Sequence, residues 1–228
     1  MTTEAEALNV TINERDTVTA LLYVAPKKDR TGMTVILGHG AGAGQLHPFM
    51  RLFASGLAAR GFDTMTFNFV YMEQGRHVPD PKAKLEACYR AVIEAAQKHK
   101  TLKGNRVIIG GKSMGGRIAT HLAAEGFDGL VGTLALGYPL HPPGKPEQLR
   151  VKHLPAISTP VLIVQGERDV FGTPDELRPV LDAMPAPVRL HVVPGGDHSL
   201  VVRGRPRDEV LAEVLDIAAG WMLTPRVH

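Results

Sequence analysis

Residues 107–117 read Val-Ile-Ile-Gly-Gly-Lys-Ser-Met-Gly-Gly-Arg, a β-branched run that passes through glycines into residues of helical character. Within it, Gly111-x-Ser113-x-Gly115 is the pattern of a sharp strand-to-helix turn that lifts a serine hydroxyl above the edge of a sheet. The flanking glycines remove side chains that would clash across such a turn. The pattern therefore predicts that Ser113 is a nucleophile and that the N–H of Met114, at a helix N-terminus, stabilises an oxyanion.

Two other kinds of turn share part of this pattern. A phosphate-binding loop also ends in Gly-Lys-Ser, but it requires a further glycine five positions before Gly111, where this chain has Arg106. A phosphate-binding loop is therefore excluded. An ordinary turn in which Ser113 only caps the following helix remains the alternative to a nucleophile.

A second glycine-rich loop, Gly38-His39-Gly40-Ala41-Gly42, follows the apolar run Met33–Leu37. A loop in this position supplies the second oxyanion donor in such sheets, and the N–H of Ala41 is the predicted donor because it follows the His-Gly pair. His39 is expected to brace the loop. The same glycines fit the loose form of a dinucleotide-binding loop, but the next strand ends in Phe67-Asn68-Phe69 and lacks the acidic residue that such a site needs.

An acid and a base follow two later strands. Asp169 comes after the predicted strand Pro160–Gln165, and His198 comes after Val188–Val193. Ser113, Asp169 and His198 stand in the chain order of a nucleophile, acid and base on a parallel sheet. A serine hydroxyl needs a base to take its proton, and the base needs an acid to fix its tautomer. The nearest rivals for the acid are Glu167 and Asp197.

Strands alternate with helices along the chain, which predicts one α/β domain over residues 1–228. We expect a mostly parallel central sheet with helices on both faces. The expected strands are Thr17–Ala25, Met33–Leu37, Asp63–Phe69, Arg106–Gly110, Leu130–Gly137, Pro160–Gln165 and Val188–Val193. The expected helices are Pro48–Arg60, Pro81–Lys100, Met114–Ala124, Pro174–Met184 and Arg207–Leu223. The irregular segment Tyr138–Thr159 is too short for a large lid domain.

Composition excludes several other classes of protein. The net charge is only +3 and the basic residues are scattered, so we expect no nucleic-acid partner. Cys88 is the only cysteine, which rules out an intrachain disulfide and suits the cytoplasm. No secretory signal or membrane-spanning run is present, and no metal-binding motif, so we expect no membrane partner, no metal and no cofactor. A monomer or a homodimer is expected.

Several aromatic and polar side chains are predicted to line the site, although each of them, taken singly, is also typical of core or loop packing. The candidates for substrate contact are Tyr71, Tyr138, His141 and Phe171, with Phe49 and Met72 as further wall residues. Lys112, Glu73 and Arg117 are expected to form a charged cluster behind the turn, either as a structural salt bridge or as an anion-binding group.

These motifs together resemble the α/β-hydrolase superfamily over essentially the whole chain. The resemblance is narrower to small domains related to dienelactone hydrolase, in a branch that includes a testis-expressed protein and a subunit of a chromatin acetyltransferase complex. It rests on residues 39–42, 67–69, 73–76, 79–81, 111–117, 137–141 and 196–199. The resemblance implies the α/β-hydrolase fold, the triad of Ser113, Asp169 and His198, and no cofactor. Dienelactone hydrolase itself has a cysteine where this chain has Ser113.

The sequence thus predicts a serine hydrolase that cleaves a small or medium acyl ester or thioester through an acyl-enzyme. Two alternatives stay open. Some relatives in the branch serve as scaffolds, so a non-catalytic interaction protein is the first. A hydrolase of peptide or C–C bonds would use the same triad and is the second.

Overall fold

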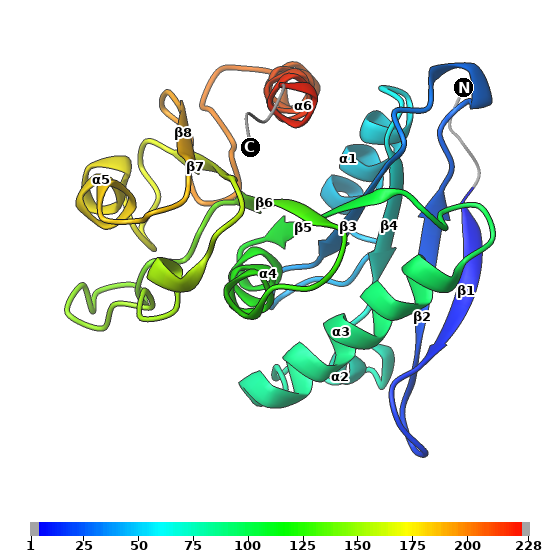
Figure 1. Cartoon of the computed structure of the whole chain (residues 1–228). Helices are drawn as coiled ribbons and strands as arrows, with labels where there is room; N and C mark the ends of the chain where they lie inside the picture. Colours follow the sequence, from blue (N-terminus) through cyan, green and yellow to red (C-terminus); the bar gives the residue numbers. More distant parts are fainter. Residues whose placement is uncertain (1–4, 225–228) are drawn as a thin grey trace.

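The computed structural model describes residues 5–224 as one twisted sheet of eight strands with helices on both faces (Figure 1). The strand order is β1-β2-β4-β3-β5-β6-β7-β8. β2 pairs antiparallel with β1 and β4, whereas β3 to β8 pair in parallel. The strands are β1 Glu6–Thr11, β2 Thr17–Tyr23, β3 Met33–Gly38, β4 Asp63–Phe67, β5 Arg106–Lys112, β6 Leu130–Leu136, β7 Val161–Gly166 and β8 Val188–Val193. The prediction of a mostly parallel sheet is confirmed.

The helices divide between the two faces because side chains alternate along each strand. In β3, Val35 and Leu37 pack in one hydrophobic core with α1 and α6, and Ile36 packs in the other with α3, α4 and α5. Figure 1 shows this arrangement in space. The helices are α1 Pro48–Ala58, α2 Val70–Glu73, α3 Lys82–Lys98, α4 Met114–Glu125, α5 Pro174–Asp182 and α6 Arg207–Leu223. Within residues 5–224, none of them is both long and apolar enough to cross a membrane.

Two elements differ from the prediction. β1 was not predicted; it pairs with β2 at the edge of the sheet, and Val10 is its only buried residue. The short α2, which follows β4, was not predicted either. β1 is held by backbone pairing with the next strand, and α2 by the hydrogen bond between Glu73 and Thr19 of β2. The segment Tyr138–Thr159 is irregular apart from a single 3-10 turn at Leu154–Ala156, and no lid domain is present in residues 5–224.

The ends of β3 and β5 approach each other more closely than side chains would allow. A Cβ added at Gly111 or at Gly115 would lie 2.1 Å from the carbonyl oxygen of Gly38. Gly111 also has φ of 152°, where other residues are strained. This contact locks the loop after β3 against the start of α4, so the two glycine-rich segments are held side by side.

Gly115→Ala is therefore expected to destabilise the protein by about 3 kcal/mol or more, because the backbone must move to admit the methyl group. Gly220→Ala is the matched control: Gly220 is exposed in α6, and an added Cβ there meets nothing within 4 Å. That change should stabilise the helix by about 0.5–1 kcal/mol. Urea unfolding of both variants measures the difference, and equal effects would show that the close approach to Gly38 is not a constraint.

Candidate active site

Ser113 sits in a strained turn between β5 and α4. Its φ is 51° and its ψ is −114°, a region that residues other than glycine rarely adopt. Such a conformation costs about 1–3 kcal/mol and persists only where the surrounding structure holds it. The Ser113 N–H donates to the Leu136 carbonyl at 2.9 Å, and the Ser113 carbonyl accepts from Arg117 N–H at 3.0 Å. The turn therefore points the hydroxyl off the sheet edge, as the glycine pattern predicts.

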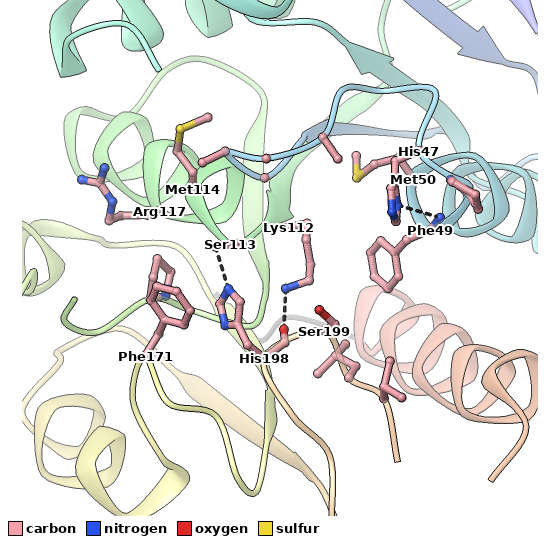
Figure 2. Close-up of a pocket in the computed structure, with 18 of the residues that line it drawn as sticks. His47, Phe49, Met50, Lys112, Ser113, Met114, Arg117, Phe171, His198 and Ser199 are labelled. Atoms are coloured by element: carbon pink, nitrogen blue, oxygen red, sulfur yellow. Dashed lines mark hydrogen bonds between the residues drawn. The ribbon is translucent and has the colours of Figure 1, made fainter. Parts of the chain in front are cut away.

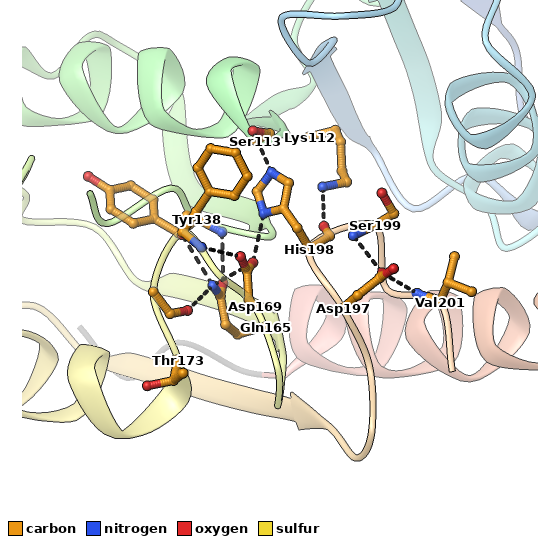
Figure 3. Close-up of polar contacts among 12 residues, drawn as sticks. Lys112, Ser113, Tyr138, Gln165, Asp169, Thr173, Asp197, His198, Ser199 and Val201 are labelled. Atoms are coloured by element: carbon orange, nitrogen blue, oxygen red, sulfur yellow. Dashed lines mark hydrogen bonds and ion pairs between the residues drawn. The ribbon is translucent and has the colours of Figure 1, made fainter. Parts of the chain in front are cut away.

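The structure brings Ser113, His198 and Asp169 into one hydrogen-bonded chain (Figure 3). The Ser113 Oγ lies 2.8 Å from His198 Nε2, and His198 Nδ1 lies 2.7 Å from Asp169 Oδ2. Asp169 is 1% exposed. The ring proton sits on Nδ1 in this arrangement, which leaves Nε2 free to accept the serine proton. Three strands supply the three groups, because the loops after β5, β7 and β8 meet at the same edge.

His198 is held from two further sides. The ring of Phe171 lies against the imidazole with centroids 4.2 Å apart. The backbone carbonyl of His198 accepts a hydrogen bond of 2.5 Å from the Lys112 ammonium, which Figure 2 shows beside Ser113. Burial lowers the pKa of Lys112 to about 8, against the opposing effect of Asp169 and Asp197. Lys112 therefore ties the histidine loop to the turn that carries Ser113.

Gln165, at the end of β7, is a supporting residue that the sequence did not single out. It is fully buried, and its Nε2 donates to Asp169 Oδ2 at 2.9 Å and to the Gly172 carbonyl at 2.7 Å. Its Oε1 accepts from Tyr138 N–H at 2.7 Å. Asp169 Oδ1 accepts from Phe171 N–H at 2.8 Å. Each oxygen of the carboxylate is thus fixed by a donor besides the histidine.

The rival acids lie elsewhere. The Glu167 carboxylate accepts from Gly195 N–H at 2.6 Å. The Asp197 carboxylate is exposed and accepts from the N–H groups of Ser199 and Val201 at 2.8 and 2.9 Å. Both acids shape the loops that carry Asp169 and His198 and do not face the imidazole.

The loop after β3 runs alongside the nucleophile. A Cβ added at Gly40 would lie 3.7 Å from that of Ser113, and Ala41 lines the same cavity. His39 is buried, and burial lowers its pKa to about 4, so the ring is neutral. Its Nδ1 lies 2.7 Å from the Gly40 carbonyl and its Nε2 accepts from Phe69 N–H at 3.0 Å. His39 therefore braces the loop. The oxyanion roles of Ala41 and Met114 remain predictions.

A cavity of about 1050 Å³ opens above Ser113 and extends to both sides of it (Figure 2). One side, here called the apolar side, lies between α1, α6 and the loop after β8. It is lined by Phe49, Leu200, Val210, Leu211 and Val214. The other side, here called the arginine side, lies between the starts of α3 and α4 and the segment 138–159. It is lined by Lys82, Arg117, Pro139, Arg150 and Phe171.

Four of the predicted wall residues do not line the cavity, whereas Phe49 and Phe171 do. The four are Tyr71, Met72, Tyr138 and His141. Tyr71 and Tyr138 are fully buried because their hydroxyls are satisfied by backbone carbonyls, those of Ala41 at 2.9 Å and Arg150 at 2.7 Å. Burial raises the pKa of each tyrosine to about 12.

His141 is buried beside Glu176, and its backbone N–H donates to the Phe171 carbonyl at 3.0 Å. Tyr71, Tyr138 and His141 thus lie one layer behind the wall. Each of the three holds a residue that does line the cavity, and none of their own side chains lies on the cavity wall.

The predicted charged cluster does not form. The Glu73 carboxylate accepts from the Thr19 hydroxyl at 2.6 Å and from the Asn68 amide at 2.9 Å. Lys112 is engaged with the histidine loop, and Arg117 lines the cavity. Glu73 therefore ties α2 to β2 and does not balance either cation.

Known proteins provide a comparison for this site and fold. A family model described as an alpha/beta hydrolase domain matches residues 31–223. A dienelactone hydrolase from Anabaena variabilis superposes with a TM-score of 0.77 at 20% identity, covering 98% of each chain. An alpha-beta serine hydrolase homologue from Coxiella burnetii gives 0.76 at 18% identity, covering 97% of this chain and 98% of its own. A serine hydrolase without a lid from Xanthomonas campestris gives 0.73 at 17% identity, covering 100% and 99%.

Proposed function

Since the chain belongs to the α/β-hydrolase family, we propose that it is a serine hydrolase that cleaves an acyl ester or thioester through an acyl-enzyme on Ser113. The observation that carries the proposal is the unbroken chain of hydrogen bonds from Ser113 through His198 to the buried Asp169, at the base of a large cavity. A protein that only binds partners has no use for all three groups in this geometry.

Each group has a chemical task in the proposed reaction. His198 takes the hydroxyl proton as Ser113 attacks the carbonyl carbon, and Asp169 stabilises the imidazolium. The N–H groups of Met114 and Ala41 hold the negative oxygen of the tetrahedral intermediate. His198 then gives its proton to the departing alcohol or thiol, which leaves the acyl group on the serine. Water, activated by the same imidazole, releases the acid and restores the enzyme.

We place this activity in the cytoplasm, as a monomer or a homodimer. Cys88, the only cysteine, is buried in the core, where burial raises the pKa of its thiol to about 12. A buried thiol of this kind is an unreactive core group, as suits a reducing compartment. All three triad groups come from one chain, so a second copy is not needed to complete the site.

The nucleophile is tested by labelling with a fluorophosphonate probe, which reacts with activated serines. The wild-type protein should be labelled and Ser113→Ala should not. Ser199→Ala is the matched control, because Ser199 lines the same cavity but has no base bound to it, and this variant should still be labelled. A folded wild-type protein that resists the probe would favour a scaffold. Chromogenic esters of graded chain length then define the acyl group.

A further inference from the structure

The arginine side of the cavity carries two guanidinium groups without a carboxylate partner. Within residues 5–224, neither Arg117 nor Arg150 takes part in an ion pair, although other arginines such as Arg60, Arg76 and Arg90 do. The Nε of Arg117 is buried and has no hydrogen-bond partner. A buried donor left unsatisfied is costly, and such a group calls for a ligand atom.

A lysine and two histidines lie around the two arginines. Lys82 lines the same side, and the His121 and His153 rings stack nearby with centroids 3.6 Å apart. Burial lowers the pKa of Arg117, and repulsion from the charge of Arg150 lowers it as well, so the two guanidinium groups interact electrostatically. Burial, followed by the neighbouring His121 and Arg117, lowers the pKa of His153 to about 3, so this ring is neutral.

The acidic groups of this region are engaged elsewhere. Asp80 lines the cavity, but its Oδ1 lies 2.7 Å from Arg76 and its Oδ2 accepts from Tyr71 N–H. Glu86 lies 3.2 Å from Lys82 and 3.6 Å from His121. Glu86 also acts electrostatically on Arg117, but within residues 5–224 neither cavity arginine has a carboxylate at ion-pair distance, so both guanidinium groups are available to a bound anion.

Arg150 is also held in place before any ligand arrives. It lies in the irregular segment after β6, yet its carbonyl accepts from the buried Tyr138 hydroxyl at 2.7 Å and its N–H donates to Leu140 at 2.8 Å. Arg117 lies one helical turn after the nucleophile in α4. The backbone of each arginine is thus fixed by its own element, and both side chains line one wall of the cavity, where guanidinium groups can bind a planar or tetrahedral anion.

We propose that Arg117 and Arg150 bind an anionic group of the substrate, a carboxylate or a phosphate-type group, while Ser113 attacks the carbonyl. The substrate class is then an ester or thioester that carries a negative charge at one end. Its uncharged part lies on the apolar side of the cavity. The cleavage of such an ester rests on the proposed function, whereas the binding of the anion by the two arginines does not.

The first test compares umbelliferyl esters of matched length in the wild-type protein: the neutral valerate, the hemi-glutarate with a free carboxylate, and the 4-phosphonobutyrate. The kcat/KM for one or both charged esters should exceed that for the valerate by at least about tenfold, the worth of a charge-assisted hydrogen bond. The preferred anion identifies the carboxylate or the phosphonate as the better mimic. No preference for either charged ester would overturn the proposal.

Arginine variants show where such a preference arises. Arg150→Gln should reduce the charged-to-neutral ratio by about tenfold or more, and Arg150→Lys should reduce it less. Arg117→Gln should act in the same way if it folds. Arg178→Gln is the matched control, since Arg178 is 59% exposed on α5 and pairs only with Asp175. A ratio that falls equally in Arg178→Gln would mean a general surface effect and would contradict the proposal.

A binding measurement separates this inference from the proposed function. Calorimetry on Ser113→Ala should detect binding of glutarate or butyl phosphate. The double variant Ser113→Ala/Arg150→Gln should bind neither anion. The neutral valeramide should give no binding signal with Ser113→Ala. If anions bind in a way that depends on Arg150 but the wild-type protein is not labelled by fluorophosphonate, the anion site is supported and the hydrolase proposal is rejected. Labelling of the wild type with no anion binding would reject the anion site and retain the hydrolase.

Discussion

His198→Ala is expected to lower kcat by about 10⁶-fold, and adding Ser113→Ala to that variant should lower it no further. The serine and the histidine act as one unit, because neither the attack nor the departure of the leaving group proceeds without the proton transfer between them. The 2.8 Å contact between Ser113 Oγ and His198 Nε2 is the geometric basis of this unit. Steady-state turnover of an activated ester by the two single variants and the double variant gives the comparison.

The control for this series is His77→Ala, because His77 is an exposed loop residue that does not line the cavity. It should retain kcat within a factor of about two. Urea midpoints of all variants show whether they are folded. Losses that multiply in the double variant would mean that the two groups act independently, which would contradict a shared mechanism.

The sequence predicted which serine, acid and histidine would meet, because each follows a strand directly. Loops after neighbouring parallel strands must meet at one edge, so the order Ser113, Asp169, His198 implied proximity without any knowledge of side-chain direction. The bounds of β8 and α6 agree with the prediction to the residue. Where the position of a side chain depends on strand order, the pattern of the chain was sufficient to predict it.

The walls of the cavity were not predictable in the same way. An aromatic side chain in a loop can face a cavity or a core, and the choice depends on backbone angles that no short pattern encodes. Tyr71 and Tyr138 turn inward because a backbone carbonyl lies within reach of each hydroxyl. Arg150 could not be assigned to the cavity from the sequence, because only the fold brings the irregular segment after β6 beside α4.

The role of Gln165 could not be predicted from the sequence for a different reason. It ends a buried strand as an apolar residue would, and its function comes from Tyr138, Asp169 and Gly172, which converge on it only in the folded chain. β1 was missed for a related reason, since an edge strand is fixed by backbone pairing with β2 more than by its own side chains.

Asp169→Asn should lower kcat by about 10⁴-fold, a fall of the size that the equivalent change causes in a serine protease triad. The carboxylate accepts hydrogen bonds on both oxygens, from His198 and Gln165 on Oδ2 and from Phe171 N–H on Oδ1. An asparagine must turn its NH₂ group toward one of these sides. On the Oδ2 side it faces the Gln165 amide and forces the proton of His198 onto Nε2, so the imidazole can no longer accept from Ser113.

In the other orientation, the NH₂ group meets the N–H of Phe171, and two donors face each other in a site where Asp169 is 1% exposed. Neither rotamer of the asparagine satisfies its neighbours, so a loss of stability of about 1–3 kcal/mol should accompany the loss of turnover. Asp197→Asn is the matched control: its retained oxygen still accepts from the N–H groups of Ser199 and Val201, and kcat should stay within about tenfold. If Asp197→Asn instead caused the larger fall in kcat, Asp197 and not Asp169 would be the acid of the triad.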